Sequence, residues 1–193
     1  MTTVTVEPVT DLEQTIAFCL EKVRRTREGP NTLLLAGSAY TEASRERLWA
    51  VLEEVESWPR WSPLHTATRW TDGASLAVGA RFDQQLDLGF PLGRSTESAV
   101  LAFADRAARA GWVGENGGVR SCHLWTLAPA DDGRTRVCNV EAFAGPPILL
   151  IKPFVARRWR RQFQAAVDGL IAVAEGAQQR EMPPSTGAPR VQP

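Results

Sequence analysis

Two side chains near the middle of the chain could act together in proton transfer. His123 lies in the alternating stretch 119–127, and Glu141 lies in the alternating stretch that follows it. An imidazole can donate or accept a proton near neutral pH, and a nearby carboxylate stabilises its protonated form, so the two could form a general acid/base couple. One alternative is that His123 only lines the core. For Glu141 we prefer a structural ion pair with an arginine, the candidates being Arg81, Arg94 and Arg120.

The sequence offers neither a nucleophile–base motif nor a metal-ligand pattern. Its cysteines, Cys19, Cys122 and Cys138, are widely separated, and it holds only two histidines. Zinc sites need ligands at short, regular spacings, so we predict no metal and no cofactor. We interpret Cys122 and Cys138 as buried, inert thiols. Free cysteines are typical of a reducing compartment, which predicts a cytoplasmic protein.

The composition excludes several classes of protein. The 22 basic residues equal the 22 acidic ones, whereas a nucleic-acid-binding protein normally carries a basic excess. Acidic residues interrupt the N-terminal segment before it can resemble a signal peptide, and no apolar run is long enough to span a membrane. Hydrophobic residues make up 44% of the chain, enough for a sizeable core in a soluble domain.

Alternating apolar and polar residues predict strands through most of the chain. Short turns rich in glycine and aspartate separate consecutive strands, so neighbouring strands must be antiparallel. The predicted strands are Thr32–Tyr40, His65–Trp70, Arg81–Leu88, Gly93–Phe103, Arg109–Gly114, Val119–Leu127 and Arg134–Phe143.

Three helices are expected to accompany the strands. The longest, Pro153–Ala177, carries an apolar stripe at helical spacing, with Pro153 in its first turn and Gly176 as its cap. A second helix follows Ser44, and a third, within residues 12–23, is interpreted as a packing or dimerisation element. We divide the chain into a strand (4–9) and helix extension over residues 1–30, a domain over 31–177, and a disordered proline-rich tail over 178–193.

The motifs that join these elements resemble a known superfamily. The most specific one is W-P-x-W-x-P at Trp58–Pro63, which follows the helix and precedes the strands. Matching segments surround it in the expected order: Ser44–Trp49, Val55–Ser57, Val78–Phe82, His123–Leu127 and Gly133–Val137. Together they resemble the SRPBCC superfamily, also called START-like or helix-grip, and within it the polyketide cyclase/dehydrase and lipid-transport group. The resemblance implies an α+β fold, with a curved antiparallel sheet of about six or seven strands around the long C-terminal helix and an apolar cavity between them.

Strand alternation selects the side chains that would face this cavity. On the strand of His123, the inward face also holds Val119, Ser121, Trp125 and Leu127. On the fourth strand, Ser95, Glu97 and Phe103 share one face, but the pattern does not decide whether that face is the inward one. Large aromatics are also common core fillers, so a ligand role for the tryptophans competes with simple packing. The predicted ligand-binding residues are Gln84, Leu86, Glu97, Trp125, Asn139, Phe143, Trp159, Phe163 and Val167.

Three functions fit these features. The leading hypothesis is a protein that binds a small hydrophobic molecule, either as a cyclase/aromatase that folds a poly-carbonyl chain or as a non-catalytic carrier. The third hypothesis is a subunit that stabilises a partner protein. We expect the chain to be a monomer or a homodimer. The arginine run 157–161 beside the loop 148–151 could contact a membrane surface, but we prefer a solvated helix face. His65 is expected to be exposed.

Overall fold

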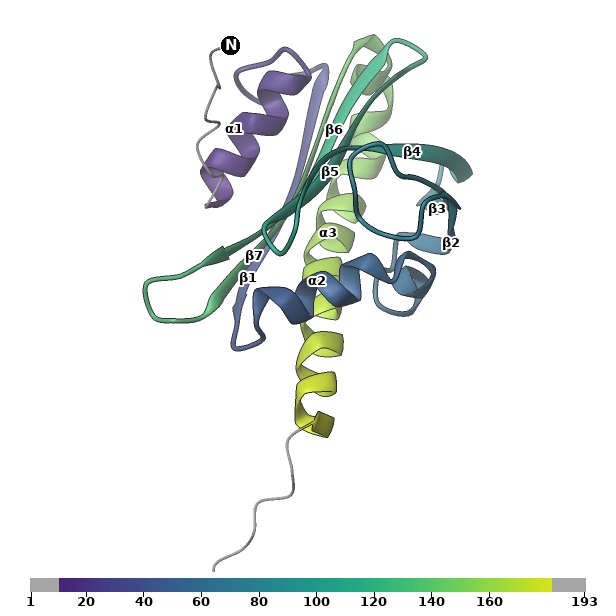
Figure 1. Cartoon of the computed structure of the whole chain (residues 1–193). Helices are drawn as coiled ribbons and strands as arrows, with labels where there is room; N and C mark the ends of the chain where they lie inside the picture. The colour runs from purple at the N-terminus through teal and green to yellow at the C-terminus, as the bar shows by residue number, and fades with distance from the viewer. Residues whose placement is uncertain (1–10, 182–193) are drawn as a thin grey trace, which may run out of the picture.

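Seven antiparallel strands form one sheet that curves around a long helix (Figure 1). The computed structural model describes residues 11–181. Its strand order is β1-β7-β6-β5-β4-β3-β2, so the first strand pairs with the last. This architecture confirms the predicted helix-grip fold. The strands are β1 (Thr32–Thr41), β2 (His65–Asp72), β3 (Arg81–Gly89), β4 (Gly93–Asp105), β5 (Arg109–Asn116), β6 (Val119–Pro129) and β7 (Thr135–Ala144).

The long helix extends beyond both predicted ends. Helix α3 spans Pro146–Glu181, with Pro153 inside it, so the expected loop 148–151 is instead its first turns. A proline in a helix interior is costly in isolation, but the buried Ile148 anchors the preceding turns to the core. Gly176 does not have a positive φ, so it continues the helix rather than capping it.

The two predicted terminal segments lie mostly outside the described residues. The expected strand over residues 4–9 precedes residue 11, where the description begins. The expected disordered tail began at residue 178, but residues 178–181 belong to α3, and the remainder of the tail is not described.

Helix α3 packs very closely on β1. The apolar stripe of α3 is buried as predicted, and its closest approach to the sheet is at Gly37. A Cβ atom at Gly37 would lie 2.7 Å from the carbonyl oxygen of Phe163 and 2.9 Å from the Cα of Gln164. Both of these are backbone atoms of α3. Any residue larger than glycine would therefore push the helix away from the sheet.

We expect Gly37→Ala to destabilise the protein by about 1–3 kcal/mol, the usual cost of overpacking a core. Urea unfolding would measure the loss. Gly29→Ala is the matched control, because a Cβ at Gly29 meets no atom within 4 Å. Equal stability of the two variants would contradict the close packing of α3 on β1.

Helix α1 (Leu12–Lys22) covers the opposite, outer face of the sheet (Figure 1). Asp11 caps it by accepting a hydrogen bond from the backbone N–H of Gln14. Its buried side chains include Cys19, whose Sγ lies 3.0 Å from that of Cys122 on β6. Burial raises the pKa of the Cys19 thiol, and also that of Cys138, consistent with inert, protonated cysteines. The apolar face of α1 is therefore used for packing within the chain.

The W-P-x-W-x-P corner connects the second helix to the sheet. Helix α2 (Arg45–Glu53), capped by the Ser44 side chain, leads into the 3₁₀ helix η1 (Val55–Arg60). Trp58 is 2% exposed and donates from Nε1 to the carbonyl oxygen of Leu52 at 2.8 Å. Its ring contacts four others, from Trp61, His65, Phe82 and Trp112. The corner therefore forms the centre of an aromatic cluster.

The predicted alternation of β4 is wrong at its end. Phe103 was expected to share a face with Glu97, but it packs edge-to-face against Phe18 of α1, with ring centroids 5.0 Å apart. The register of β4 shifts between Leu101 and Phe103. A bulge of this kind adds a residue to the alternation and sends the following side chains to the other face.

Candidate functional site

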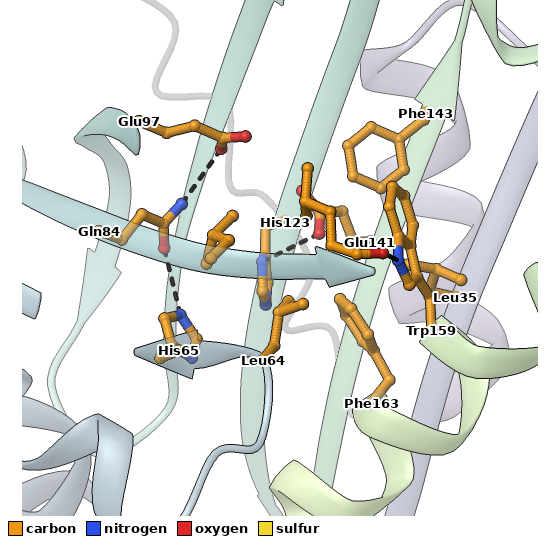
Figure 2. Close-up of a pocket in the computed structure, with 12 residues that line it drawn as sticks. Leu35, Leu64, His65, Gln84, Glu97, His123, Glu141, Phe143, Trp159 and Phe163 are labelled. Carbon is orange, nitrogen blue, oxygen red and sulfur yellow. Dashed lines mark hydrogen bonds and ion pairs between the residues drawn. The ribbon is translucent and has the colours of Figure 1, made fainter. Parts of the chain in front are cut away.

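A pocket lies between the inner face of the sheet and α3 (Figure 2). Its volume is about 60 Å³, and its walls are mostly apolar. Polar side chains from β2, β3, β4, β6 and β7 form the rest of the lining. The lining residues are Leu35, Leu64, His65, Gln84, Leu86, Leu88, Glu97, His123, Glu141, Phe143, Trp159 and Phe163.

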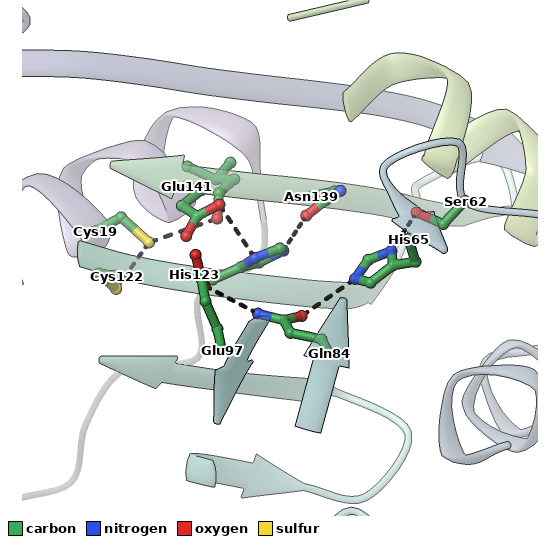
Figure 3. Close-up of polar contacts among 10 residues, drawn as sticks. Cys19, Ser62, His65, Gln84, Glu97, Cys122, His123, Asn139 and Glu141 are labelled. Atoms are coloured by element: carbon green, nitrogen blue, oxygen red, sulfur yellow. Dashed lines mark hydrogen bonds and ion pairs between the residues drawn. The ribbon is translucent and has the colours of Figure 1, made fainter. Parts of the chain in front are cut away.

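His123 and Glu141 form a buried pair in this pocket. They are directly opposite each other on β6 and β7, and Nδ1 of His123 lies 3.4 Å from Oε2 of Glu141 (Figure 3). Their side chains are only 7% and 11% exposed. Glu141 therefore contacts His123 rather than an arginine, which corrects the ion pair preferred from the sequence. Asn139, two residues before Glu141 on the same face, accepts a hydrogen bond from Nε2 of His123 at 2.7 Å.

These contacts set which ring nitrogen of His123 faces the Glu141 carboxyl. Because Oδ1 of Asn139 accepts from Nε2 of His123, that nitrogen carries a hydrogen, and Nδ1 faces the Glu141 carboxyl. A neutral imidazole would then aim a lone pair at a carboxylate, which is repulsive without a hydrogen between them. The contact is therefore favourable when a hydrogen lies between Nδ1 and Oε2, which makes the two side chains a hydrogen-bonded acid/base couple.

Aromatic rings hold the imidazole of His123 in place. The ring of Trp112 lies 4.2 Å from it and that of Phe163 lies 5.4 Å from it, measured between centroids. Trp112 comes from the strand next to β6, and Phe163 comes from α3, so the ring is held from the sheet and from the helix. A fixed ring orientation favours proton transfer to a ligand in a defined position.

A second set of polar contacts crosses the pocket (Figure 3). Ser62 Oγ lies 2.7 Å from Nδ1 of His65, and Nε2 of His65 lies 3.2 Å from Oε1 of Gln84. Gln84 donates from Nε2 to Oε2 of Glu97 at 3.4 Å. His65 is thus half-buried and lines the pocket, and the expectation that it is exposed is wrong. The turn before β2 directs it inward, where the sequence pattern offered only a strand end.

The pocket favours the neutral forms of two of its groups. Burial lowers the pKa of His65 from 6.5 to about 4, although its contact with Gln84 acts in the opposite direction. Burial also raises the pKa of the Glu97 carboxyl, and the nearby Glu141 raises it further. A protonated Glu97 would be able to donate a hydrogen bond to a ligand oxygen.

The shifted pKa of His65 predicts a pH-dependent stability. Because the folded protein disfavours the charged imidazole, this stabilisation is complete above pH 6.5 and is lost as the pH falls toward about 4. The difference between the two pKa values corresponds to about 3 kcal/mol. In His65→Gln, the amide can replace both hydrogen bonds but does not titrate. Between these pH values, we expect the free energy of unfolding of this variant, measured with urea, to fall by about 3 kcal/mol less than that of the wild-type protein. An identical decline in both proteins would contradict the assignment.

A wider cleft adjoins the pocket. It has a volume of about 480 Å³, lies between β4 and the end of β5, and shares four lining residues with the pocket. The shared residues are Gln84, Glu97, Glu141 and Phe143. The cleft volume, unlike that of the pocket, falls within the roughly 300–1,000 Å³ typical of small-molecule sites.

Most of the predicted site residues meet at this pocket. His123, Glu141, Gln84, Leu86, Glu97, Phe143, Trp159 and Phe163 all line it. Trp125, Asn139 and Val167 do not: Trp125 and Val167 pack in the core beside Trp61, and Asn139 lies behind His123. Apart from the end of β4, alternation gave the correct inward faces of the strands, but it does not show where along each strand the cavity ends.

Sequence reasoning did not select four of the lining residues. Leu35, Leu64, His65 and Leu88 belong to β1, to the turn before β2, to β2 and to β3. Leu88 shares a face with Leu86, so strand alternation was a usable signal for it. His65 carried no such signal.

Within the described residues we looked for features that would bind a metal ion or a membrane. Within residues 11–181, no three side chains of the metal-binding types converge on one point. None of the helices in the same range has the length and apolarity needed to cross a membrane. Leu149 and Leu150, in the first turns of α3, are 54% and 72% exposed, respectively.

Comparison of the sequence with protein families gives one decisive match. A profile of the family described as polyketide cyclase/dehydrase and lipid transport matches residues 35–175. The chain belongs to this family. The match covers β1 to the last part of α3, and so includes every strand that contributes to the pocket. No curated protein matches the sequence.

Solved structures share the fold of this family member at low sequence identity. The Zhui aromatase/cyclase from Streptomyces sp. R1128 has a TM-score of 0.59 and 13% identity, covering 75% of this chain and 94% of its own. The hypothetical protein jhp0584 from Helicobacter pylori has a TM-score of 0.62 and 17% identity, covering 90% and 99%. Norcoclaurine synthase from Thalictrum, solved with a transition-state analogue, has a TM-score of 0.57 and 12% identity, covering 76% and 96%.

Proposed function

We propose that this protein binds a small hydrophobic carbonyl compound and catalyses proton transfer on it, as a cyclase or dehydrase of its family would. The observation that carries the proposal is the buried His123–Glu141 pair, an imidazole in contact with a carboxyl group inside a largely apolar pocket. A pocket that served only to hold an apolar molecule would not need this pair, because burying ionisable groups is costly.

The arrangement supports a defined sequence of proton transfers. The Glu141 carboxylate, hydrogen-bonded to His123, takes a proton from the carbon next to the carbonyl, and the electron pair of the broken C–H bond moves toward the carbonyl oxygen as the enolate forms. The Gln84 amide donates a hydrogen bond to that oxygen as its negative charge develops. The enolate carbon then attacks a second carbonyl of the same chain, whose oxygen takes up the electron pair of its C=O bond and receives the proton from Glu141; otherwise the proton returns to the carbon. Positioning of the chain supplies much of the rate enhancement.

The wild-type protein tests this proposal through deuterium exchange. Prodan, a neutral fluorescent naphthyl ketone, serves as the probe, and solvent deuterium entering the carbon next to its carbonyl is followed by mass spectrometry. The proposal predicts that prodan binds and that the protein accelerates its exchange above the buffer rate. Binding without acceleration would instead indicate a non-catalytic carrier, the second function that the family description includes.

A pair of leucine variants locates the binding. Leu88→Phe adds bulk at the pocket wall, whereas Leu92→Phe makes the same change on the β3–β4 turn, where the side chain is 37% exposed. We expect the first to weaken prodan binding and the second to leave it unchanged. Native mass spectrometry of the purified protein gives an independent readout, through the mass of any co-purifying molecule. Equal prodan affinity of both variants would place the ligand elsewhere.

A further inference from the structure

The sheet separates between β4 and β5. Pairing of these strands begins at Leu101 opposite Trp112 and runs toward the turn between them, so it involves only the last part of β4. Residues 94–100 of β4 pair with β3, while β5 pairs with β6 along its whole length. β4 therefore turns away from the β5–β6 hairpin (Figure 1).

The separation starts at a bulge and leaves two backbone edges facing each other. The register shift between Leu101 and Phe103 marks the point where the strands diverge, as expected for a bulge that increases local twist. Residues 95–100 and 113–116 then form opposite walls of the cleft of about 480 Å³. Strand edges of this kind present N–H and C=O groups that a ligand can pair with.

The cleft leads directly to the proton-transfer pair. Glu141 and Glu97 line both the cleft and the inner pocket, so the two spaces meet at these carboxyl groups. We infer that the gap between β4 and β5 is the entrance to the pocket and the outer half of its binding site. This inference rests on the proposed function, since it assigns the route and the outer contacts of the same ligand. The cleft also provides the room for a ligand that the inner pocket, at about 60 Å³, lacks.

The lining of the two spaces defines the class of ligand. The inner part ends against the rings of Trp159 and Phe163, which suit an apolar group. The outer part offers hydroxyl and amide side chains beside the strand edges, which suit hydrogen-bonding groups; they come from Ser95, Asn116 and Ser121. None of the residues that line the cleft is a lysine or an arginine that could pair with an anion. The ligand is therefore amphipathic, with an uncharged polar end, and is not a fatty acid.

Gly114 allows the entrance to be narrowed without altering the inner pocket. It lies opposite Ser121 and lines the cleft, and a Cβ there would meet only the Ser121 hydroxyl, at 3.1 Å. We expect Gly114→Leu to lower the association rate constant of prodan, measured by stopped-flow fluorescence, about tenfold. Gly29→Leu is the matched control and should bind at the wild-type rate, because the space around Gly29 is open.

Each outcome separates this inference from the proposed function. An unchanged association rate in a folded Gly114→Leu variant would overturn the entrance but leave pocket binding intact. Failure of the wild-type protein to bind prodan would overturn both. An uncharged polar end of the ligand predicts weaker binding of the anionic probe anilinonaphthalene sulfonate than of prodan. Equal or tighter binding of the anionic probe would contradict this ligand class.

Hydrogen exchange of the wild-type protein tests the entrance between β4 and β5 even if the Gly114→Leu variant does not fold. Amides on the open strand edges should exchange quickly in the free protein and slow down when prodan binds. The inference predicts this protection within residues 95–100 and 113–116. Protection confined to other segments, such as the start of α3, would overturn it.

Discussion

His123→Ala and Glu141→Gln are each expected to slow deuterium exchange of bound prodan by about 100-fold or more, the usual contribution of a positioned acid/base group. Each change removes one member of the pair that shares a proton. The double variant should be no slower than the slower single one, because the two side chains act as a unit. Mass spectrometry of prodan after timed incubation in deuterated buffer gives the rates.

The exposed face of α3 provides the control for these variants. Arg157→Gln changes a charge on that face, so its exchange rate should equal that of the wild-type protein. Prodan affinity should change much less than the rate in both pair variants, since most of the pocket wall is apolar. Wild-type rates in both pair variants would rule out proton transfer by His123 and Glu141.

Trp58→Ala is expected to lower the free energy of unfolding by about 3–5 kcal/mol, the range for removing a large aromatic residue from a core. The indole is 2% exposed and contacts the ring of Trp61, just after η1, and rings from β2, β3 and β5, so its loss leaves a cavity that several elements would have to fill. Urea unfolding measures the change. Trp58→Phe should cost less, because it keeps most of the ring contacts and loses mainly the hydrogen bond to Leu52.

The same substitution at a half-buried tryptophan provides the comparison. Trp70 contacts Phe82 from the side of β2 and remains partly exposed, so Trp70→Ala should cost about 1 kcal/mol. If Trp58→Ala cost no more than Trp70→Ala, the corner would not be the packing centre that joins α2 to the sheet.

The fold could be predicted from the sequence because its local signals agree with one another. Alternation located all seven strands to within a few residues, and the corner around Trp58 placed the second helix before them. Alternation also brought His123 and Glu141 to the same face. Their contact could not be predicted, because it depends on the register between β6 and β7, which places them directly opposite each other.

Other features depended on tertiary context that no local pattern expresses. Pro153 and Gly176 are usual signals of helix ends, yet both lie inside α3, where burial of the apolar stripe outweighs their local cost. The bulge after Leu101 reversed the face of Phe103 and opened the cleft. His65 is directed inward by its turn and by its contacts with Ser62 and Gln84.

The most direct test of the central claim is the position of a bound ketone relative to His123. The chain has two histidines, so carbon-13 labelling of histidine gives two sets of ring signals, and His65→Gln assigns them. We predict nuclear Overhauser effects between the ring protons of His123 and the protons next to the carbonyl of bound prodan. Bound prodan that shows no such contact with His123 would contradict the proposed site and the proton transfer assigned to it.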